Sequence, residues 1–537
     1  MAEKGKGSEE NGNAAAGGMK EPEGFAGMKW QKMGMKSVSE RATERIREVL
    51  SNVSGALDDE ESIKCIWLSG TLFFVVGGYW LLRSLKDPII SVIDGVEYIP
   101  QAKMASLVVV VVLVAIYNWL LDIMPKHHLF YGMGAIYGVL FLIMGLMLMH
   151  PTIGLANTKA DPSRLLGWIS YVTIESFGSM VVQCYWALVN ATVDVKFAKK
   201  NFGFIIAGAQ IGSILGPTLA TQAATIGIPG LYLCGSAVMF CMITAMYYYV
   251  QRFGAAPDDQ EKADQEKADE ANMAAGKPVE KKEEKKKGGM LEGFWLMYKH
   301  NFVQGIFFIS SLFMVNVTVI DYMMKVLAKE RYAEMYPDDP QAAVRAFASF
   351  MGYFGQTTNS ISFLFSLFGT GAVIKNFGFT NVLIAFPVLL LICSSFVWIS
   401  PTIWVVFGVM MVIKGMSYAL NNPTKEILYQ ATSTNIKFKC KSWIDTFGQR
   451  SAKAGGSLIT NACASNLADL NNYGFLTGAV MSCFLIWVSK HMGELFEKLQ
   501  GEDRKVGEES ESELAAAAEV VMSPLPTSDK EKESVDV

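Results

Sequence analysis

The stretch Glu175–Gly216, ESFGSMVVQCYWALVNATVDVKFAKKNFGFIIAGAQIGSILG, contains the pattern on which this chain is built. An apolar run with one acid ends in WALVN, a basic segment VKFAKK follows, and a second run opens with glycines at helical spacing. The same order returns downstream as YALNN at 418–422, IKFKCK at 436–441 and GQRSAKAGG at 448–456. Such a repeat indicates a duplicated architecture. In a membrane protein, two such halves usually face each other across a site near the midplane.

The composition is that of a membrane protein. Of the 537 residues, 51% are hydrophobic and only 18% are charged, whereas soluble proteins carry about 25% charged residues. The charges crowd into both tails and a central insert, leaving long apolar runs between them. No cleavable secretory signal is visible in the first sixty residues, so we expect the first spanning segment to direct targeting.

About twelve segments are apolar enough, and long enough at about twenty residues each, to cross a bilayer as helices. They lie near 65–83, 104–121, 129–149, 165–190, 202–224, 230–250, 302–325, 350–374, 381–399, 402–421, 452–468 and 473–489. The eleventh is the weakest because it is short and polar. The sequence therefore predicts an all-α polytopic membrane protein with two six-helix halves.

Charged segments divide the chain into five parts. We expect a cytosolic N-terminal tail (1–63), a first half (64–250), a charged cytosolic linker (251–301), a second half (302–490) and a cytosolic C-terminal tail (491–537). Within the N-terminal tail, Ser37–Leu57 has the spacing of an amphipathic helix. With an even number of spans, the segments rich in Lys and Arg near the span ends lie on the same side of the membrane as both termini. Because cytosolic segments carry the excess of Lys and Arg, we expect both termini in the cytosol.

Ionisable side chains inside apolar runs are costly and usually mark functional sites. Within the predicted spans and at their ends they are Arg83, Lys86, Glu175, Asp321, Lys325, Lys414, Arg450 and Lys453. Snorkelling to the interface is the structural alternative for Arg83 and Lys86. Asp321 and Lys325 have the i,i+4 spacing of an intrahelical pair. Because both halves bring Lys or Arg toward the interior, we expect a strongly anionic substrate.

Other residue patterns favour structural roles. Gly208, Gly212 and Gly216 form GxxxGxxxG, which lets a neighbouring backbone approach closely. Tyr185, Trp186 and Tyr418 could stack a base, although most membrane aromatics pack or mark an interface. The eight cysteines occur singly and without CxxC spacing, so we interpret them as small buried hydrophobes rather than as a disulfide or metal framework. Adjacent His127 and His128 are weak evidence for a metal.

Several ordered motifs make this chain resemble the nucleotide transporter family, the ATP/ADP translocases of plastids and intracellular bacteria. They are LLRSLKDPI at 81–89, IESFGSMVV at 174–182, YWALVN with AKK at 185–200, YALNNPTKE at 418–426 and KSWIDTFGQRSAKAGGSLI at 441–459. The resemblance implies a major-facilitator-like fold and exchange of ATP, ADP or related nucleotides.

The resemblance also implies roles for particular residues. The residues on which the family relies for function correspond by position to Lys86, Glu175, Asp321 and Lys453. Asn190, the last residue of WALVN, completes the set of candidate substrate-binding residues. Three places depart from the family pattern. Asp321 stands where Glu is common, Asn422 stands where Asp is usual before proline, and Asn201-Phe202-Gly203 replaces the aromatic–proline pattern that is usual after AKK.

The electrostatics of the predicted cavity also favours exchange of one nucleotide for another. A hollow lined with uncompensated lysines is expensive to close and reorient at low dielectric, and a bound nucleotide relieves that repulsion. We therefore expect counter-exchange antiport by alternating access, with Glu175 and Asp321 as partial counter-charges in the empty state. The alternative is a proton-coupled symporter of nucleotides or another organic anion, with one of these acids carrying the proton.

Other classes of function fit less well. A phosphate-binding loop GxxxxGK[ST] and a nucleophile–base arrangement are both absent from the sequence, which argues against ATP-driven transport and against an enzyme. A scaffold is disfavoured by the many charges in the spans. The expected partners are the bilayer and nucleotides (ATP and ADP, with GTP and deoxynucleotides as further candidates), without nucleic acid or cofactor. We expect a monomer in an endomembrane, with the plastid envelope and the plasma membrane as alternatives.

Overall fold

The computed structural model describes residues 60–255 except 194, and residues 292–507 except 369, 434, 435, 437–439, 442, 464, 465 and 503. All that follows concerns the unit Asp58–Val537. The expected amphipathic helix Ser37–Leu57, most of the charged linker and the C-terminal tail beyond 507 lie outside the described residues.

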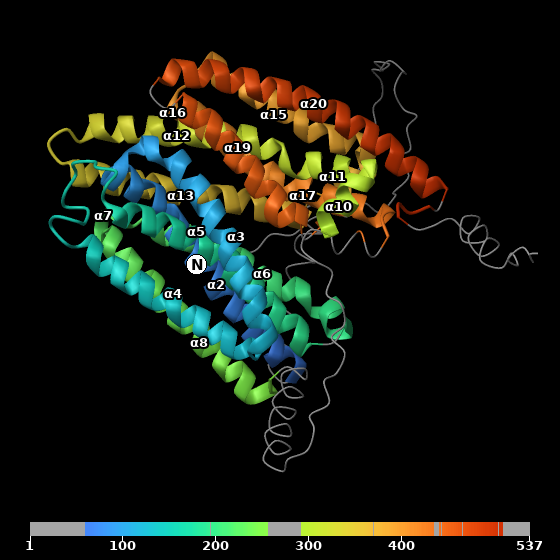
Figure 1. The fold of residues 1–537 in the computed structure, drawn as a ribbon, viewed down its shortest axis with the longest axis horizontal. Coiled ribbons are helices and arrows are strands. Elements are labelled where there is room, and N and C mark those ends of the chain that lie inside the picture. The colour runs from blue at the N-terminus through green and yellow to red at the C-terminus, as the bar shows by residue number, and fades with distance from the viewer. Residues whose placement is uncertain are drawn as a thin grey trace, which may run out of the picture. The chain divides into compact units, whose positions relative to one another are not determined.

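The first half contains six long helices, as the sequence predicts (Figure 1). They are α2 (Glu60–Ile90), α3 (Ile99–Ile123), α4 (Lys126–Leu148), α5 (Leu165–Thr192), α6 (Val195–Ala220) and α8 (Ile228–Phe253), with a short α7 (Ala223–Ile226) before the last. A π turn, η1 (Ser91–Gly95), and a 3-10 turn, η2 (Val96–Tyr98), join α2 to α3. Gly95 in this connection has a φ of 124°, which glycine adopts most easily.

The second half repeats this order with more interruptions. Its elements are α10 (Glu292–Lys299), α11 (Asn301–Ser311), α12 (Phe313–Met335), α13 (Pro340–Phe368), α14 (Thr370–Phe377), α15 (Phe379–Ile399), α16 (Ile403–Met416), η3 (Ser417–Asn421), α17 (Asn422–Leu428), η4 (Tyr429–Ala431), η5 (Ile444–Gly448), α19 (Gln449–Ala462) and α20 (Leu467–Gly501). The last helix continues past residue 490, where the sequence placed the start of the tail. After it, Val506 forms a parallel bridge with Thr432.

Eight segments of the described chain are long and apolar enough to cross a bilayer. One of them, Glu60–Leu121, contains both α2 and α3, and at 1.5 Å per residue it is long enough for two crossings. The expected eighth, tenth and eleventh spans correspond to α13, α16 and α19. These helices are not among the eight segments, because each is too short or too polar to meet the requirement of length and hydropathy. α19 is the most polar of these because Gln449, Arg450 and Lys453 lie in its first turns.

Glycines bring pairs of helices into close contact at equivalent places in the two halves. A Cβ on Gly208, Gly212 or Gly216 of α6 would collide with the backbone or the Ser69 hydroxyl of α2. In the second half, a Cβ on Gly456 of α19 would lie 2.8 Å from the Val315 carbonyl oxygen of α12. The packing interpretation of the GxxxGxxxG motif is therefore confirmed, and the fifth span of each half packs on its first.

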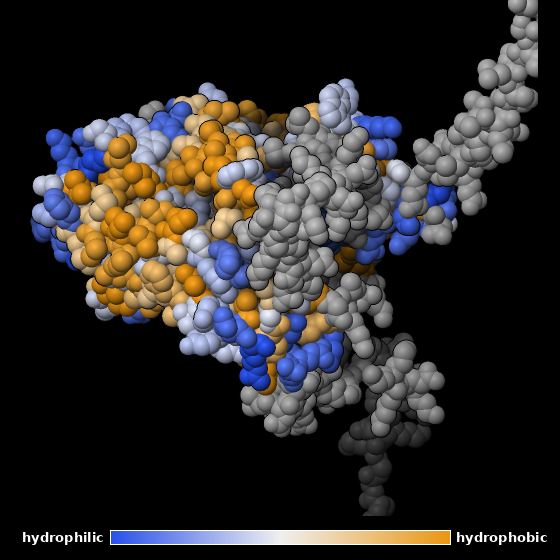
Figure 2. All heavy atoms as spheres, turned by 60° about the horizontal axis from the view of Figure 1, so that its bottom comes forward, coloured by the Kyte–Doolittle hydropathy of each residue, from blue (hydrophilic) through white to orange (hydrophobic). Residues whose placement is uncertain are grey.

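One apolar cluster joins the two halves. Ile90, Ile99, Ala102 and Tyr171 of the first half pack among the α12, α13 and α16 side chains of the second half. These four residues lie around the α2–α3 connection and on α5, so the halves meet at that end of the first half. Large apolar side chains also cover the outer helix surfaces, as Figure 2 shows on one face.

The cysteines are only partly as expected. Cys65, Cys184, Cys393 and Cys440 are buried, but Cys241 and Cys483 are exposed. The prediction of buried hydrophobes is wrong for these two, because they lie on outer faces of α8 and α20, where a spanning helix meets apolar lipid rather than protein.

Candidate functional site

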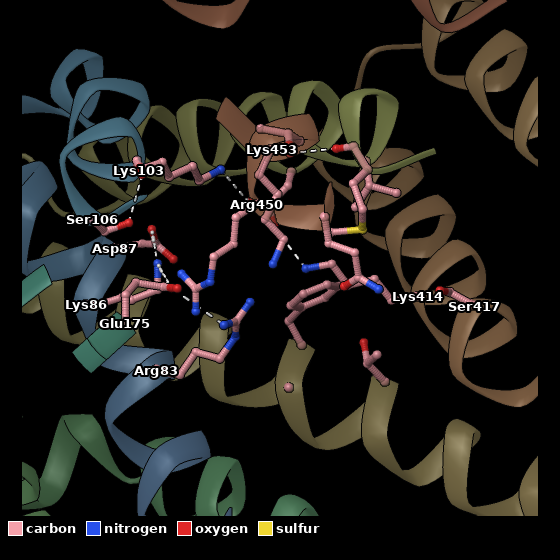
Figure 3. A pocket seen from close by; sticks show the side chains of 18 of the residues that line it. Arg83, Lys86, Asp87, Lys103, Ser106, Glu175, Lys414, Ser417, Arg450 and Lys453 are labelled. Atoms are coloured by element: carbon pink, nitrogen blue, oxygen red, sulfur yellow. Dashed lines mark hydrogen bonds and ion pairs between the residues drawn. The ribbon is translucent and has the colours of Figure 1, made fainter. Parts of the chain in front are cut away.

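A cavity of about 280 Å³ lies between the two halves (Figure 3). Its wall comes from α2, α3 and α5 of the first half and from α12, α13, α16, η3, α17, η5 and α19 of the second. Ligand pockets for small molecules usually have volumes of about 300–1,000 Å³, so this cavity is near the lower end of that range.

The cavity wall is strongly cationic. Among the described residues, eight basic side chains line it: Arg83, Lys86, Lys103, Lys325, Lys414, Lys425, Arg450 and Lys453. Four acidic side chains line it as well: Asp87, Glu175, Asp321 and Asp445. Eight cations less four acids leave a formal excess of four positive charges. This excess predicts a polyanionic ligand.

Glu175 of α5 is the first of two acids surrounded by cations. Its carboxylate lies 3.3 Å from the Lys86 Nζ and 3.6 Å from the Arg83 guanidinium, both on α2. Arg450 of α19 reaches across from the second half and donates to the Ser179 hydroxyl, one turn along α5. Lys86 also lies over the Tyr171 ring, 3.7 Å from its centroid. Cations from both halves therefore gather around a single carboxylate.

Asp321 of α12 is the second such acid. Its carboxylate accepts from Lys325 at 2.6 Å, from Lys414 of α16 at 3.1 Å and from Lys103 of α3 at 3.2 Å. The intrahelical pair predicted from the i,i+4 spacing of Asp321 and Lys325 is thus confirmed. One carboxylate here balances three lysines, and one of those lysines comes from the other half.

Asp87 connects these two groups of charges. It lies 3.3 Å from Lys86 on its own helix and 3.0 Å from Lys325 of α12. A buried charge is tolerated when it is paired and hydrogen-bonded, and here each charge has a partner of opposite sign. The result is a continuous series of ion pairs from Arg83 to Lys414.

Lys453 and Arg450 differ from the other cations. Both line the cavity, yet neither has an acidic side chain within 4.0 Å among the described residues. The other lining cations are each within that distance of a carboxylate. The charges of Lys453 and Arg450 are therefore the ones most available to an anionic ligand.

Eight of the nine candidate residues from the sequence line this cavity. Lys86 is 3% exposed, so it does not snorkel to the interface. Asn190 is the exception: it lies in the last turn of α5, is exposed, and does not line the cavity. The reason is helical geometry, since Asn190 lies four turns beyond Glu175 along the same helix.

Of the three aromatic residues considered for stacking a base, two pack between helices and one lines the cavity. The Tyr185 hydroxyl donates to the Leu68 carbonyl at 2.8 Å and the ring is fully buried, so this side chain packs α5 on α2. Trp186 packs on Phe202. Tyr418 lines the cavity, together with Trp80 and Phe354.

Four charged residues of the wall are not among the sequence candidates: Asp87, Lys103, Lys425 and Asp445. Lys103 was outside the expected second span, 104–121, but α3 begins at Ile99 and places it inside the helix. Lys425 follows the expected tenth span, 402–421, where the sequence gives it no more than the role of a cation near a span end; it is buried and pairs with Asp445 at 2.8 Å. An earlier helix start, signalled by Pro100 in the first turn, could have identified Lys103.

Known proteins resemble this chain in sequence and in fold. The TLC ATP/ADP transporter family matches residues 39–402 and 392–495. ADP,ATP carrier protein 1 of Chlamydia muridarum is 25% identical over 84% of this chain and 92% of its own length. ADP,ATP carrier protein 1 of Rickettsia typhi is 21% identical over 79% and 90%.

A solved structure with a similar fold is that of the nucleoside transporter NupG, with a TM-score of 0.54 and 16% identity over 80% of this chain and 99% of NupG. This likeness and the eight apolar helices confirm the predicted fold class, an all-α polytopic membrane protein. Because the family match extends over most of the sequence, the chain belongs to the TLC ATP/ADP transporter family.

Proposed function

We propose that this protein exchanges ATP, ADP or related purine nucleotides across a membrane by alternating access, as a counter-exchange antiporter. The observation that carries this proposal is the excess of four positive charges in a cavity shared by both halves. ATP and ADP carry about three to four negative charges near neutral pH, which matches that excess. The names of the Chlamydia and Rickettsia relatives support the same class of substrate.

The two cations without an acidic partner are the first contacts proposed for the phosphates. Lys453 and Arg450 project from α19 toward Glu175 and Arg83 on the opposite wall (Figure 3). Arg83 is a loose partner of Glu175 at 3.6 Å, and its Nη1 also donates to the Tyr79 hydroxyl. Its other guanidinium nitrogens are proposed to contact a phosphate. A phosphate tail between these side chains would neutralise charges from both halves at once.

Exchange follows from the electrostatics of the empty cavity. Glu175 and Asp321 compensate part of the positive charge, but an excess remains. Closing a cavity with uncompensated charges requires their desolvation, which is costly at low dielectric. The loaded protein avoids this cost, so it reorients faster than the empty one and each outward nucleotide is replaced by an inward one.

Tyr418 is the proposed platform for the base. It lines the cavity, is 43% exposed and lies one turn from Lys414. Stacking on a single ring tolerates any base, which makes GTP and deoxynucleotides candidate substrates beside ATP and ADP. We further propose that the protein acts as a monomer in an endomembrane, with both termini in the cytosol.

Uptake of labelled ATP into proteoliposomes tests the exchange. Vesicles preloaded with ADP are expected to take up label at least about tenfold faster than empty vesicles, because only loaded carriers return quickly. Equal uptake into both would contradict exchange. Uptake into empty vesicles that stops when a proton gradient is collapsed would instead support the proton-coupled symporter.

A further inference from the structure

Asp94 is a buried acid outside the cavity. It lies in η1, the π turn that follows α2, and is 1% exposed. Neither of its carboxylate oxygens accepts a hydrogen bond from the part of the chain that the structure describes. Every acid of the cavity, by contrast, has a lysine within 3.3 Å.

The surroundings of Asp94 are mostly apolar. Ile90 and Ile93 beside it are fully buried. From α5 it meets Gly167, where even a Cβ would collide with its carboxylate. The charged groups that act on it electrostatically are Arg164 and Asp161, both in the connection before α5. The site is therefore a tight enclosure with one cation and one acid at its edge.

Arg164 is near Asp94 but is engaged elsewhere. Its guanidinium donates to the carbonyl oxygens of Gly154 at 2.7 Å, Ile153 and Asn157 at 2.9 Å and Lys159 at 3.1 Å, and reaches Ile93 at 3.5 Å. These bonds hold the connection between α4 and α5 against η1. The Arg164 Nε is buried and has no acceptor among the described residues. The Arg164 Nε and the Asp94 carboxylate are thus a buried donor and a buried acceptor that each lack a hydrogen-bond partner among the described residues.

An ionised carboxylate in such a place is costly, because burial removes its hydration and no donor replaces it. The neutral acid avoids most of this cost. We propose that Asp94 is a proton-binding site, occupied in the conformation seen here. When η1 and the 149–164 connection separate, the O–H bond breaks, the proton passes to water, and the carboxylate keeps the electron pair. The Arg164 Nε–H then becomes available to it as a donor.

The position of Asp94 links this proton to the contact between the halves. Ile90 and Ile99, on either side of it in sequence, belong to the apolar cluster that joins the first half to the second. A proton on Asp94 stabilises the arrangement of η1 that supports this contact. Raising the pH at this end of the protein therefore favours the conformation in which the contact is broken. The proposal does not depend on which anion the cavity binds.

Thermal unfolding of the purified full-length protein tests the proposal. Asp94→Asn has the shape of the neutral acid but needs no proton. As pH rises, wild type must hold its proton against a decreasing proton concentration, so its unfolding temperature should fall relative to that of Asp94→Asn. We expect the difference to grow by on the order of 1–3 °C from acidic to alkaline pH. Asp338→Asn, which removes an exposed acid, is the matched control and should follow wild type.

Two results would overturn the proposal. One is a difference between Asp94→Asn and wild type that does not change with pH. The other is failure of Asp94→Asn to fold, because a neutral group of the same shape is what the proposal places at this site. Both readouts are independent of transport, so they remain informative if the protein carries a different substrate.

Discussion

Lys325 of α12 and Asp87 of α2 form an ion pair of 3.0 Å, and each side chain is 3% exposed. The two residues come from different halves, and Lys103 and Asp321 form a second pair of this kind at 3.2 Å. Each half thus supplies one acid and one base. The halves are joined here by reciprocal pairs, and under the proposed alternating access these pairs would break and re-form when the cavity changes sides.

Exchanging the charges of the first pair tests its role. Asp87→Lys or Lys325→Asp alone leaves like charges together in a buried place, and removing one partner of a buried pair costs about 3–5 kcal/mol. We expect each single variant to lose most transport and thermal stability. The double variant restores the pair between the halves but leaves Lys86 and Asp321 each beside a like charge, so it should regain only part of both. Recovery no better than that of the single variants would show that the pair between the halves contributes less than these two contacts. Unfolding temperature and ATP/ADP exchange measure the two effects.

Lys453→Ala should weaken nucleotide binding with little effect on folding. Lys453 lines the cavity and has no acidic partner among the described residues, so its removal leaves no carboxylate uncompensated. A hydrogen bond to a charged group contributes about 1.5–3 kcal/mol, which corresponds to a rise in the apparent KM for ATP of about ten- to a hundredfold. Lys498→Ala, at an exposed position of α20, is the control. An unchanged KM would exclude contact between Lys453 and the substrate.

Asp321→Asn should make exchange stricter. The carboxylate of Asp321 balances Lys325, Lys414 and Lys103, and its loss raises the positive excess of the empty cavity by one. The empty protein should then reorient more slowly, so the ratio of uptake into preloaded over empty vesicles should increase by about tenfold. Asp321→Glu keeps the charge and should retain the wild-type ratio. A ratio that falls in the Asn variant would contradict this role.

Gly216→Ala should destabilise the protein, whereas Gly70→Ala should not. A Cβ on Gly216 would collide with the Gly77 carbonyl oxygen of α2, while a Cβ on Gly70 meets nothing within 4 Å. Overpacking typically costs about 1–3 kcal/mol, and alanine in an open helical position is favoured over glycine by about 1 kcal/mol. Opposite shifts of the two unfolding temperatures are expected. Equal shifts would show that α2 and α6 can separate without cost.

The sequence predicts the local features of this structure well. Apolar runs locate the spans, because a bilayer requires about twenty such residues in succession. Charges inside those runs select Lys86, Glu175 and Asp321, which line the cavity, because charged side chains in a bilayer are costly and usually mark a site. The pair of Asp321 with Lys325 follows from spacing along one helix.

Contacts between distant parts of the chain could not be predicted in this way. Hydropathy and periodicity do not reveal that Asp87 meets Lys325 or that Arg450 meets Ser179, since these contacts depend on how two halves pack. The same limit explains Asn190: its motif resembles that of the family, but its place along α5 moves it away from the cavity. Lys103 was missed because a span boundary differed by one helical turn.

The end of α20 is tied to the wall of the cavity. Ser433 donates its N–H to the Val506 carbonyl, and Val506 donates to the Ala431 carbonyl, each at 2.9 Å. The segment after the last helix is thereby fastened to the turn that follows α17, and α17 carries Lys425. α20 also presents Leu476, Val480 and Trp487 on its outer surface. Tension or thinning of the surrounding lipid that tilts α20 would consequently be transmitted through these two hydrogen bonds to the wall of the cavity.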